Sequence, residues 1–197
     1  MRAKTAVVVS LALLLAGCSV DVAGKPSPVP SSEPSEGDTA VVPKVSQPLD
    51  VSRFEKEPCA AFTSDQLAGF GITRQPRPMP EDALGPSCMW NGLDEGGVTL
   101  GARLLKSGSL SGLYKKHEQG GLPYFQPVAD ISGYPGVLTD LLDAQPQGKC
   151  SAEVAVSNDR LYSVQVTISR NSKDYANPCP VAQKAAELAV STMKGTS

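Results

Sequence analysis

The residues before Cys18 predict that its thiol is modified by attachment of lipid. This cysteine follows Leu15, Ala16 and Gly17, and an apolar residue, two small residues and a cysteine in this order are typical of a lipobox. Signal peptidase is expected to cut between Gly17 and Cys18, and acyl chains such as palmitate would then be attached at the cysteine. Two or more such chains anchor a protein stably, so we expect Cys18 to hold this chain to a membrane.

The residues before Cys18 have the organisation of a signal peptide. Arg2 and Lys4 are positively charged, and an apolar run from Ala6 to Leu15 follows them. This run is too short to cross a bilayer as a helix. We therefore assign residues 1–17 to a lipoprotein signal peptide and place the mature protein at the outer face of the cytoplasmic membrane.

Four further cysteines predict two disulfide bonds: Cys59, Cys88, Cys150 and Cys179. An even number of cysteines in an exported chain favours disulfides, and four of them allow three connectivities. We favour Cys59–Cys88 and Cys150–Cys179, because each of these pairs brackets a local unit of about 30 residues. The cysteines form no CxxC pair and their spacing fits no compact zinc motif, so no metal site is expected.

Other side chains give little support for catalysis. His117 is the only histidine, and the chain has no G-x-S-x-G motif that would present a serine to it. Paired carboxylates could hydrolyse a glycosidic bond, and the acidic residues considered for this role are Asp130, Asp140, Asp143 and Glu153. Acidic side chains on loops are usually solvated, which argues against this catalytic role. The sequence also has no phosphate-binding loop motif. We expect neither an enzyme nor a cofactor.

Trp90 is the single tryptophan, and two interpretations of it remain open. It could line a ligand groove, because aromatic side chains commonly form such walls. Its position two residues after Cys88 favours packing in the core instead.

The composition separates a tether from a folded domain. Residues 18–53 contain six prolines and several serines with almost no aromatic residues, so we expect a disordered tether that starts at the lipidated cysteine. Residues 54–197 remain as one domain of ordinary size. Removing Arg2 and Lys4 from the 18 basic residues leaves 16 against 20 acidic ones, a net charge of −4. This charge argues against a nucleic-acid partner.

Alternating and helical patterns predict the elements of the domain. Thr63 and Gln66 form a capping box at the start of a short helix. Strand patterns over 88–93 and 98–104 predict one hairpin, and those over 151–156 and 162–168 predict a second one. Further strands are expected near 125–128 and 136–142, and helices over 110–117 and 181–193. The expected inward stripe of the last helix is Val181, Ala185, Leu188 and Thr192.

The order of these elements predicts an α+β fold. The strands are half-buried and joined by short turns, which favours an antiparallel sheet with the helices packed on one face. Two disulfides would brace this domain.

The chain resembles the actinobacterial lipoproteins classed as domain of unknown function 3558. The residues that carry the resemblance are the lipobox, the Pro/Ser-rich tether, Pro58-Cys59, Cys88-Met89-Trp90 and Asn177-Pro178-Cys179 before an Ala-rich helix. Their order and spacing cover about residues 58–194. The resemblance implies an exported lipoprotein and implies no activity. The order of elements is also similar to that of PsbP/Mog1-like lipoprotein domains, at the level of the fold alone.

The function expected from these observations is that of a membrane-anchored binding or accessory protein of the cell envelope. Its expected partners are the membrane, through Cys18, and an envelope protein, and nothing in the sequence defines an oligomeric state. One alternative is a carrier of a lipid or another hydrophobic ligand, which would need an enclosed apolar cavity. The other alternative is an enzyme whose site the sequence does not reveal.

Overall fold

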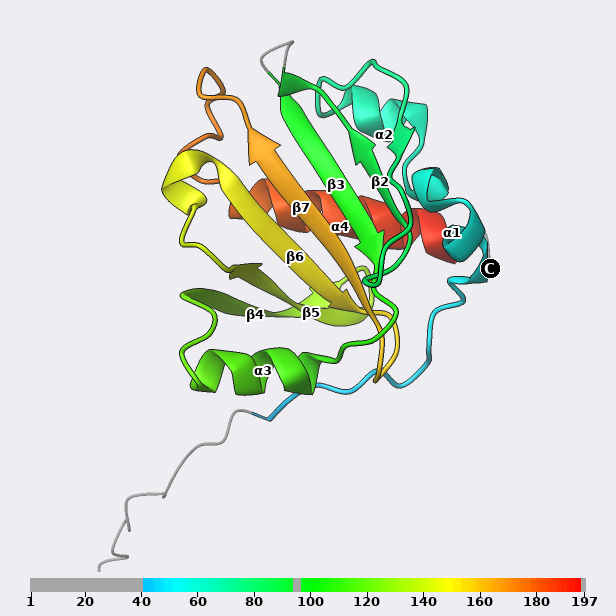
Figure 1. The fold of residues 1–197 in the computed structure, drawn as a ribbon, viewed down its shortest axis with the longest axis vertical. Helices are drawn as coiled ribbons and strands as arrows, with labels where there is room; N and C mark the ends of the chain where they lie inside the picture. The colour runs from blue at the N-terminus through cyan, green and yellow to red at the C-terminus, as the bar shows by residue number, and fades with distance from the viewer. Residues whose placement is uncertain (1–40, 94–96, 196–197) are drawn as a thin grey trace, which may run out of the picture. The chain divides into compact units, whose positions relative to one another are not determined.

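A computed structural model describes residues 41–93 and 97–195. The lipobox, with Gly17 and Cys18, and residues 18–40 of the predicted tether lie outside these ranges. The described elements are shown in Figure 1. In chain order they are α1 (Ser52–Lys56), η1 (Pro58–Ala61), α2 (Ser64–Ala68), β1 (Arg77–Pro78), β2 (Ser87–Trp90), β3 (Val98–Leu104), α3 (Leu110–Glu118), β4 (Tyr124–Ile131), β5 (Tyr134–Asp140), η3 (Gln145–Gln147), β6 (Lys149–Ala155), β7 (Leu161–Ile168) and α4 (Cys179–Lys194).

The strands form one seven-stranded sheet in the order β1-β2-β3-β7-β6-β5-β4, and every neighbouring pair is antiparallel. Both predicted hairpins are present, with Cys88 opposite Ala102 in the first and Cys150 opposite Val166 in the second. The strands β3 and β7, far apart in the sequence, pair at the centre. The predicted α+β class and antiparallel sheet are confirmed.

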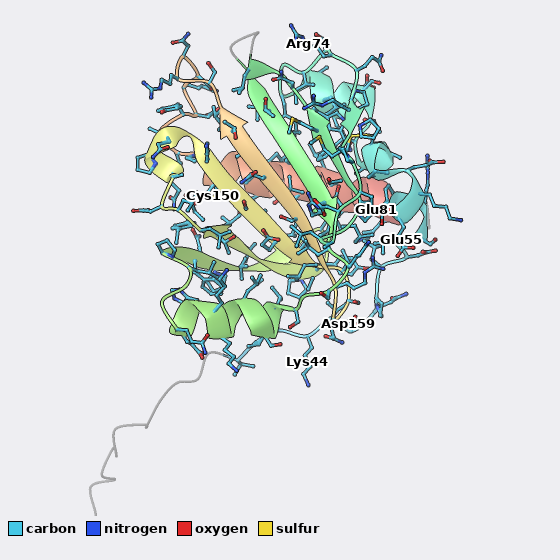
Figure 2. All side chains as sticks on the ribbon, in the orientation of Figure 1. Lys44, Glu55, Arg74, Glu81, Cys150 and Asp159 are labelled. Atoms are coloured by element: carbon cyan, nitrogen blue, oxygen red, sulfur yellow. A yellow bond between two sulfur atoms is a disulfide. The ribbon has the colours of Figure 1, made fainter. Side chains whose placement is uncertain are left out.

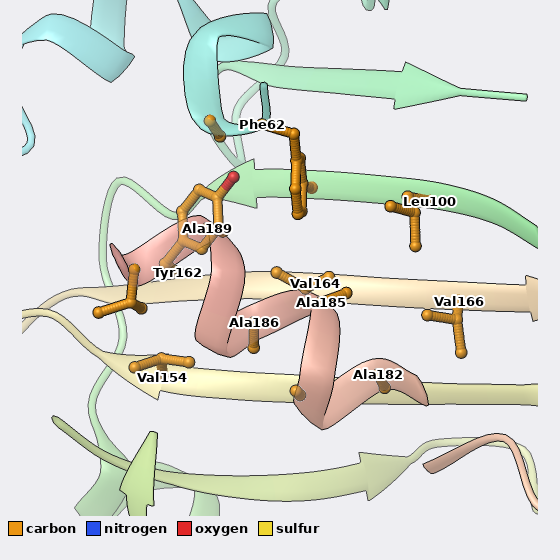
Figure 3. Packing of buried hydrophobic residues seen from close by; sticks show 14 of the residues in the cluster. Phe62, Leu100, Val154, Tyr162, Val164, Val166, Ala182, Ala185, Ala186 and Ala189 are labelled. Carbon is orange, nitrogen blue, oxygen red and sulfur yellow. The ribbon is translucent and has the colours of Figure 1, made fainter. Parts of the chain in front are cut away.

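Helix α4 covers one face of the sheet through a stripe of small side chains. Ala182, Ala185, Ala186 and Ala189 are each 0% exposed and belong to the same cluster as the strand residues below them. Figure 3 shows these alanines over side chains of β6 and β7. Because alanine has a short side chain, the helix backbone can approach the sheet closely.

The predicted inward stripe of this helix is partly confirmed. Ala185 is buried, and Val181 and Leu188 are half-buried and pack against the core, but the fully buried positions are mainly alanines that the prediction did not name. The pattern of larger apolar residues suggested a face that is rotated from the real one. Close packing against the sheet selects for small side chains, which a search for large apolar residues passes over.

Helix α3 packs on a second cluster that is separate from the main core. Its Leu110 and Tyr114 contact Val137, Ala155 and Leu161. Val137 and Ala155 project from the sheet face opposite to Leu138 and Val154, because successive side chains of a strand alternate. The helices α1, α2 and α4 therefore share one face, and α3 adds a local cover on the other face at the β5–β6 side.

The folded domain begins before residue 54, which corrects the predicted end of the tether. Val45, Leu49 and Val51 are 7–8% exposed and pack into the two clusters. The Leu49 N–H donates to the Val156 carbonyl at 2.8 Å. Proline and polar residues gave this segment the composition of a disordered chain, but three well-spaced apolar residues suffice to bury it.

Two disulfides join the helical segments to the sheet, and the predicted pairing is confirmed. Cys59 in η1 is bonded to Cys88 in β2, and Cys150 in β6 is bonded to Cys179 at the start of α4. In the chain-entropy account, a closed loop of this size stabilises the fold by about 3–4 kcal/mol.

Candidate functional site

The strands β3, β7 and β6 present one face that lies opposite to α4 and that α3 covers only near Ala155 and Leu161. In Figure 1, α4 lies behind these strands and their near face is open. Figure 2 shows the side chains that project from this face. Most of the side chains here are polar, whereas those on the α4 side of the same strands are apolar.

Two rows of residues cross this face from strand to strand. The first row runs through Ser87, Arg103, Ser163 and Glu153, on β2, β3, β7 and β6. The second row runs through Met89, Gly101, Gln165 and Ser151 on the same strands. All eight residues line a pocket of about 300 Å³ that is open to the surface, which we name the sheet-face groove.

Glu153 is the acidic residue of the sheet-face groove. The residue is half-buried, and its Oε2 atom exposes less than 1 Å² and has no hydrogen-bond partner among the described residues. Its Oε1 atom accepts a hydrogen bond from the Ser163 hydroxyl at 2.8 Å. Burial raises the pKa of Glu153 to about 7, although the hydrogen bond from Ser163 acts in the opposite direction.

Arg103 lines the same groove but does not neutralise Glu153. Its guanidinium forms an ion pair with Asp82 and donates a second hydrogen bond to the Gly85 carbonyl at 2.9 Å. The hydrogen bond from Arg103 is the main cause that lowers the pKa of the Asp82 carboxyl, with a further contribution from the Leu84 N–H. The cation in the same row as Glu153 is therefore already paired with another acid.

Ser87 and Gly101 contribute an unpartnered hydroxyl and open space to the groove. Ser87 is 5% exposed, and its hydroxyl has no partner among the described residues. A Cβ atom added at Gly101 would meet no atom within 4 Å. Glycine inside a strand often marks a place where a ligand approaches the backbone closely. Buried polar atoms without partners cost stability, so each of them needs an explanation.

The other carboxylates considered from the sequence do not join Glu153. Asp140 caps the loop that follows β5, where its oxygens accept from the N–H groups of Leu142 and Ala144. Asp130 accepts from the Gly133 N–H in the β4–β5 turn. Asp143 lies on the loop after β5 with a positive φ of 51°.

His117 and Trp90 contact aromatic side chains, and neither of them lines the sheet-face groove. His117 is exposed on α3, where its ring stacks on Phe125 with 4.5 Å between the centroids. Trp90 is 0% exposed and makes an edge contact with Phe62 at 4.9 Å. The core interpretation of Trp90 is therefore correct.

Other pockets open at the surface of the described domain, and three of them have linings that can be compared with the groove. One, of about 270 Å³, lies between Lys44 of the N-terminal segment and Leu110 of α3. The others have volumes of about 230 and 340 Å³. Unlike the sheet-face groove, none of them is lined by a buried polar atom that lacks a partner.

The described residues contain no group of three or more His, Cys, Asp or Glu side chains that could hold a metal ion. Among the same residues, no helix is long and apolar enough to cross a membrane.

Sequence reasoning named Glu153 as one acidic residue among several and did not identify the groove. The signal lies in the pairing of strands that are distant in the chain, because β3 and β7 must become neighbours before Gly101 faces Gln165. Alternating polar residues on one strand are usual for any solvated sheet face, so the pattern alone does not indicate a site.

Comparison with known proteins places the chain in a family. A search of the curated proteins found no match, and a search of the solved structures found none either. A family model matches residues 13–192, which is most of the chain. The chain belongs to the family described as protein of unknown function (DUF3558).

Proposed function

We propose that this chain is an exported actinobacterial lipoprotein that binds a protein partner of the cell envelope without catalysing a reaction. Lipid on Cys18 would hold it at the outer face of the cytoplasmic membrane, and the sheet-face groove would bind the partner. The observation that supports this function is the groove itself. It lies on the sheet face opposite to α4 and contains buried polar atoms of Glu153 and Ser87 that lack partners among the described residues.

The geometry supports binding better than hydrolysis. A glycoside hydrolase needs two carboxyl groups on either side of the bond that it cleaves. Glu153 is the one carboxylate that lines the sheet-face groove, and Arg103 beside it is held by Asp82. The groove also opens to the surface, whereas a carrier of lipid requires an enclosed apolar cavity.

The experiment is capture from detergent-solubilised membranes with the full lipidated chain as bait. A Gly101→Leu variant fills the groove, and the space around this position predicts that the fold tolerates it. We expect the variant to lose at least about ten-fold of the captured partner while its thermal unfolding is unchanged. Equal capture by both baits would place the binding surface elsewhere and contradict the proposal.

A further inference from the structure

The polar and apolar residues that line the sheet-face groove indicate which kind of partner side chain it can bind. The inference drawn from them rests on the proposed function. Apolar side chains border the groove on two sides, with Met79 and Met89 near β2 and Leu141 after β5. Leu141 is 58% exposed, so its apolar surface is available to a partner. Ser163 and Glu153 supply the polar end.

The charge of the groove is unbalanced when Glu153 is ionised. Arg103 already has Asp82 as its counter-ion, and Lys149 on β6 is exposed and sits four residues before Glu153. The Oε2 atom of Glu153 is thus an acceptor without a donor among the described residues.

We propose that the sheet-face groove binds a lysyl side chain that the protein partner presents, with the ammonium on the Glu153 carboxylate. The methylene stem of lysine would lie along the apolar border, which is the usual way in which this side chain combines an apolar body with a charged end. The charge of the ammonium complements the one unpaired acid of the groove.

The hydrogen bonds of Glu153 favour lysine over arginine. The Oε1 atom already accepts one hydrogen bond from the Ser163 hydroxyl, whereas Oε2 accepts none from the described residues, so Oε2 is the oxygen with more remaining acceptor capacity. Arginine binds a carboxylate most tightly when it forms a bidentate contact with both oxygens, whereas the compact ammonium of lysine can bind through one oxygen. Because Oε2 exposes less than 1 Å², the contact requires the Glu153 carboxyl to turn while it keeps the Ser163 hydrogen bond, and side-chain adjustments are common when interfaces form.

The experiment uses the full chain in detergent and a pair of probes that differ by one charge. Nα-acetyl-lysine methylamide carries the ammonium, and Nα-acetyl-norleucine methylamide has an uncharged side chain of similar shape. Carboxyl ¹³C NMR follows the Glu153 carbon directly during titration with each probe. The variants are Glu153→Gln, Gly101→Leu and, as a matched control on the exposed surface of α3, Glu118→Gln.

We expect the lysine probe to shift the Glu153 resonance and to lower the pKa of this carboxyl from about 7. Its affinity should fall about 30-fold from pH 8 to pH 5.5, because Glu153 becomes protonated while lysine stays charged. Glu153→Gln and Gly101→Leu should weaken binding at least about ten-fold, and Glu118→Gln should bind like the wild type.

Two outcomes would overturn the inference, and they differ in what they mean for the proposed function. Binding of the lysine probe that is unchanged in Glu153→Gln would reject Glu153 as the acceptor. If Gly101→Leu also leaves membrane capture unchanged, the groove is not the binding surface, and the proposed function fails as well. If capture is lost in Gly101→Leu but the lysine probe does not bind, the lysine inference alone fails.

Discussion

At the scale of the residue, Glu153 is an acid that the fold keeps at an energetic cost. Its carboxyl accepts one hydrogen bond from Ser163, and its second oxygen is buried without a partner among the described residues. Desolvation makes the ionised form unfavourable and raises the pKa to about 7. Ionisable groups with strongly shifted pKa values are concentrated at functional sites, which supports the binding site that we propose at Glu153.

The raised pKa predicts how stability changes with pH. The unfolded chain loses the Glu153 proton near its ordinary value of 4.5, and the folded chain loses it near 7. The unfolded state therefore binds fewer protons between these values, so the contribution of Glu153 to stability falls by on the order of 3 kcal/mol as the pH rises through this window and is constant above it. Urea unfolding at pH 4.5 and pH 8 measures this fall.

Glu153→Gln should remove this part of the pH dependence and make the protein more stable than the wild type at pH 8. Glu118→Gln is the matched control, because Glu118 is exposed and should leave the dependence intact. Identical pH profiles for Glu153→Gln and the wild type would show that the Glu153 carboxyl is solvated.

At the scale of the element, the segment 42–51 behaves as part of the folded domain. The Val45 N–H donates to Asn158 Oδ1 at 2.9 Å, and Asn158 Nδ2 donates to the Val45 carbonyl at 3.1 Å. This pair of hydrogen bonds ties the segment to the β6–β7 turn. In Figure 2, Lys44 and Asp159 mark this end of the domain.

Asn158→Ala should release this segment, because two backbone groups lose their partner at once. We expect a loss of about 1–3 kcal/mol in the free energy of unfolding. Hydrogen exchange at Val45 and Leu49 should become faster by a factor of ten or more. Asn171→Ala, at an exposed position, is the control. Unchanged exchange in Asn158→Ala would mean that the apolar contacts alone hold the segment.

The elements differ in how well the sequence predicts them, for physical reasons. The β6–β7 hairpin was predictable because its residues alternate strictly and its turn is local. The capping box of Thr63 and Gln66 was predictable because both hydrogen bonds join residues three apart, at 3.3 and 2.8 Å. The buried stripe of α4 and the docking of residues 42–51 were missed, since both depend on surfaces formed by distant strands.

At the scale of the whole molecule, we propose separate tasks for the anchor and the groove. The lipid on Cys18 would hold the protein at the membrane, and the folded domain would bind the partner protein. The described residues contain no helix that could cross a membrane, and the lipobox itself lies outside them.

Cys18→Ala should release the full chain from the membrane, because no thiol would remain for lipid attachment. Fractionation of cells followed by a carbonate wash measures this, with Ser19→Ala as the control that keeps the lipidated cysteine. A Cys18→Ala protein that stays in the washed membrane fraction would reject the lipobox interpretation.

The central claim is that the sheet-face groove contacts a partner, and photo-crosslinking from within the groove tests it most directly. A benzophenone amino acid would be placed at position 101, where the added side chain meets open space, and for comparison at position 187 on α4. Irradiation of cells that express the full chain should give a protein adduct from position 101 alone, with the crosslinked peptide containing a lysine. The same adduct from both positions, or none from position 101, would contradict the claim.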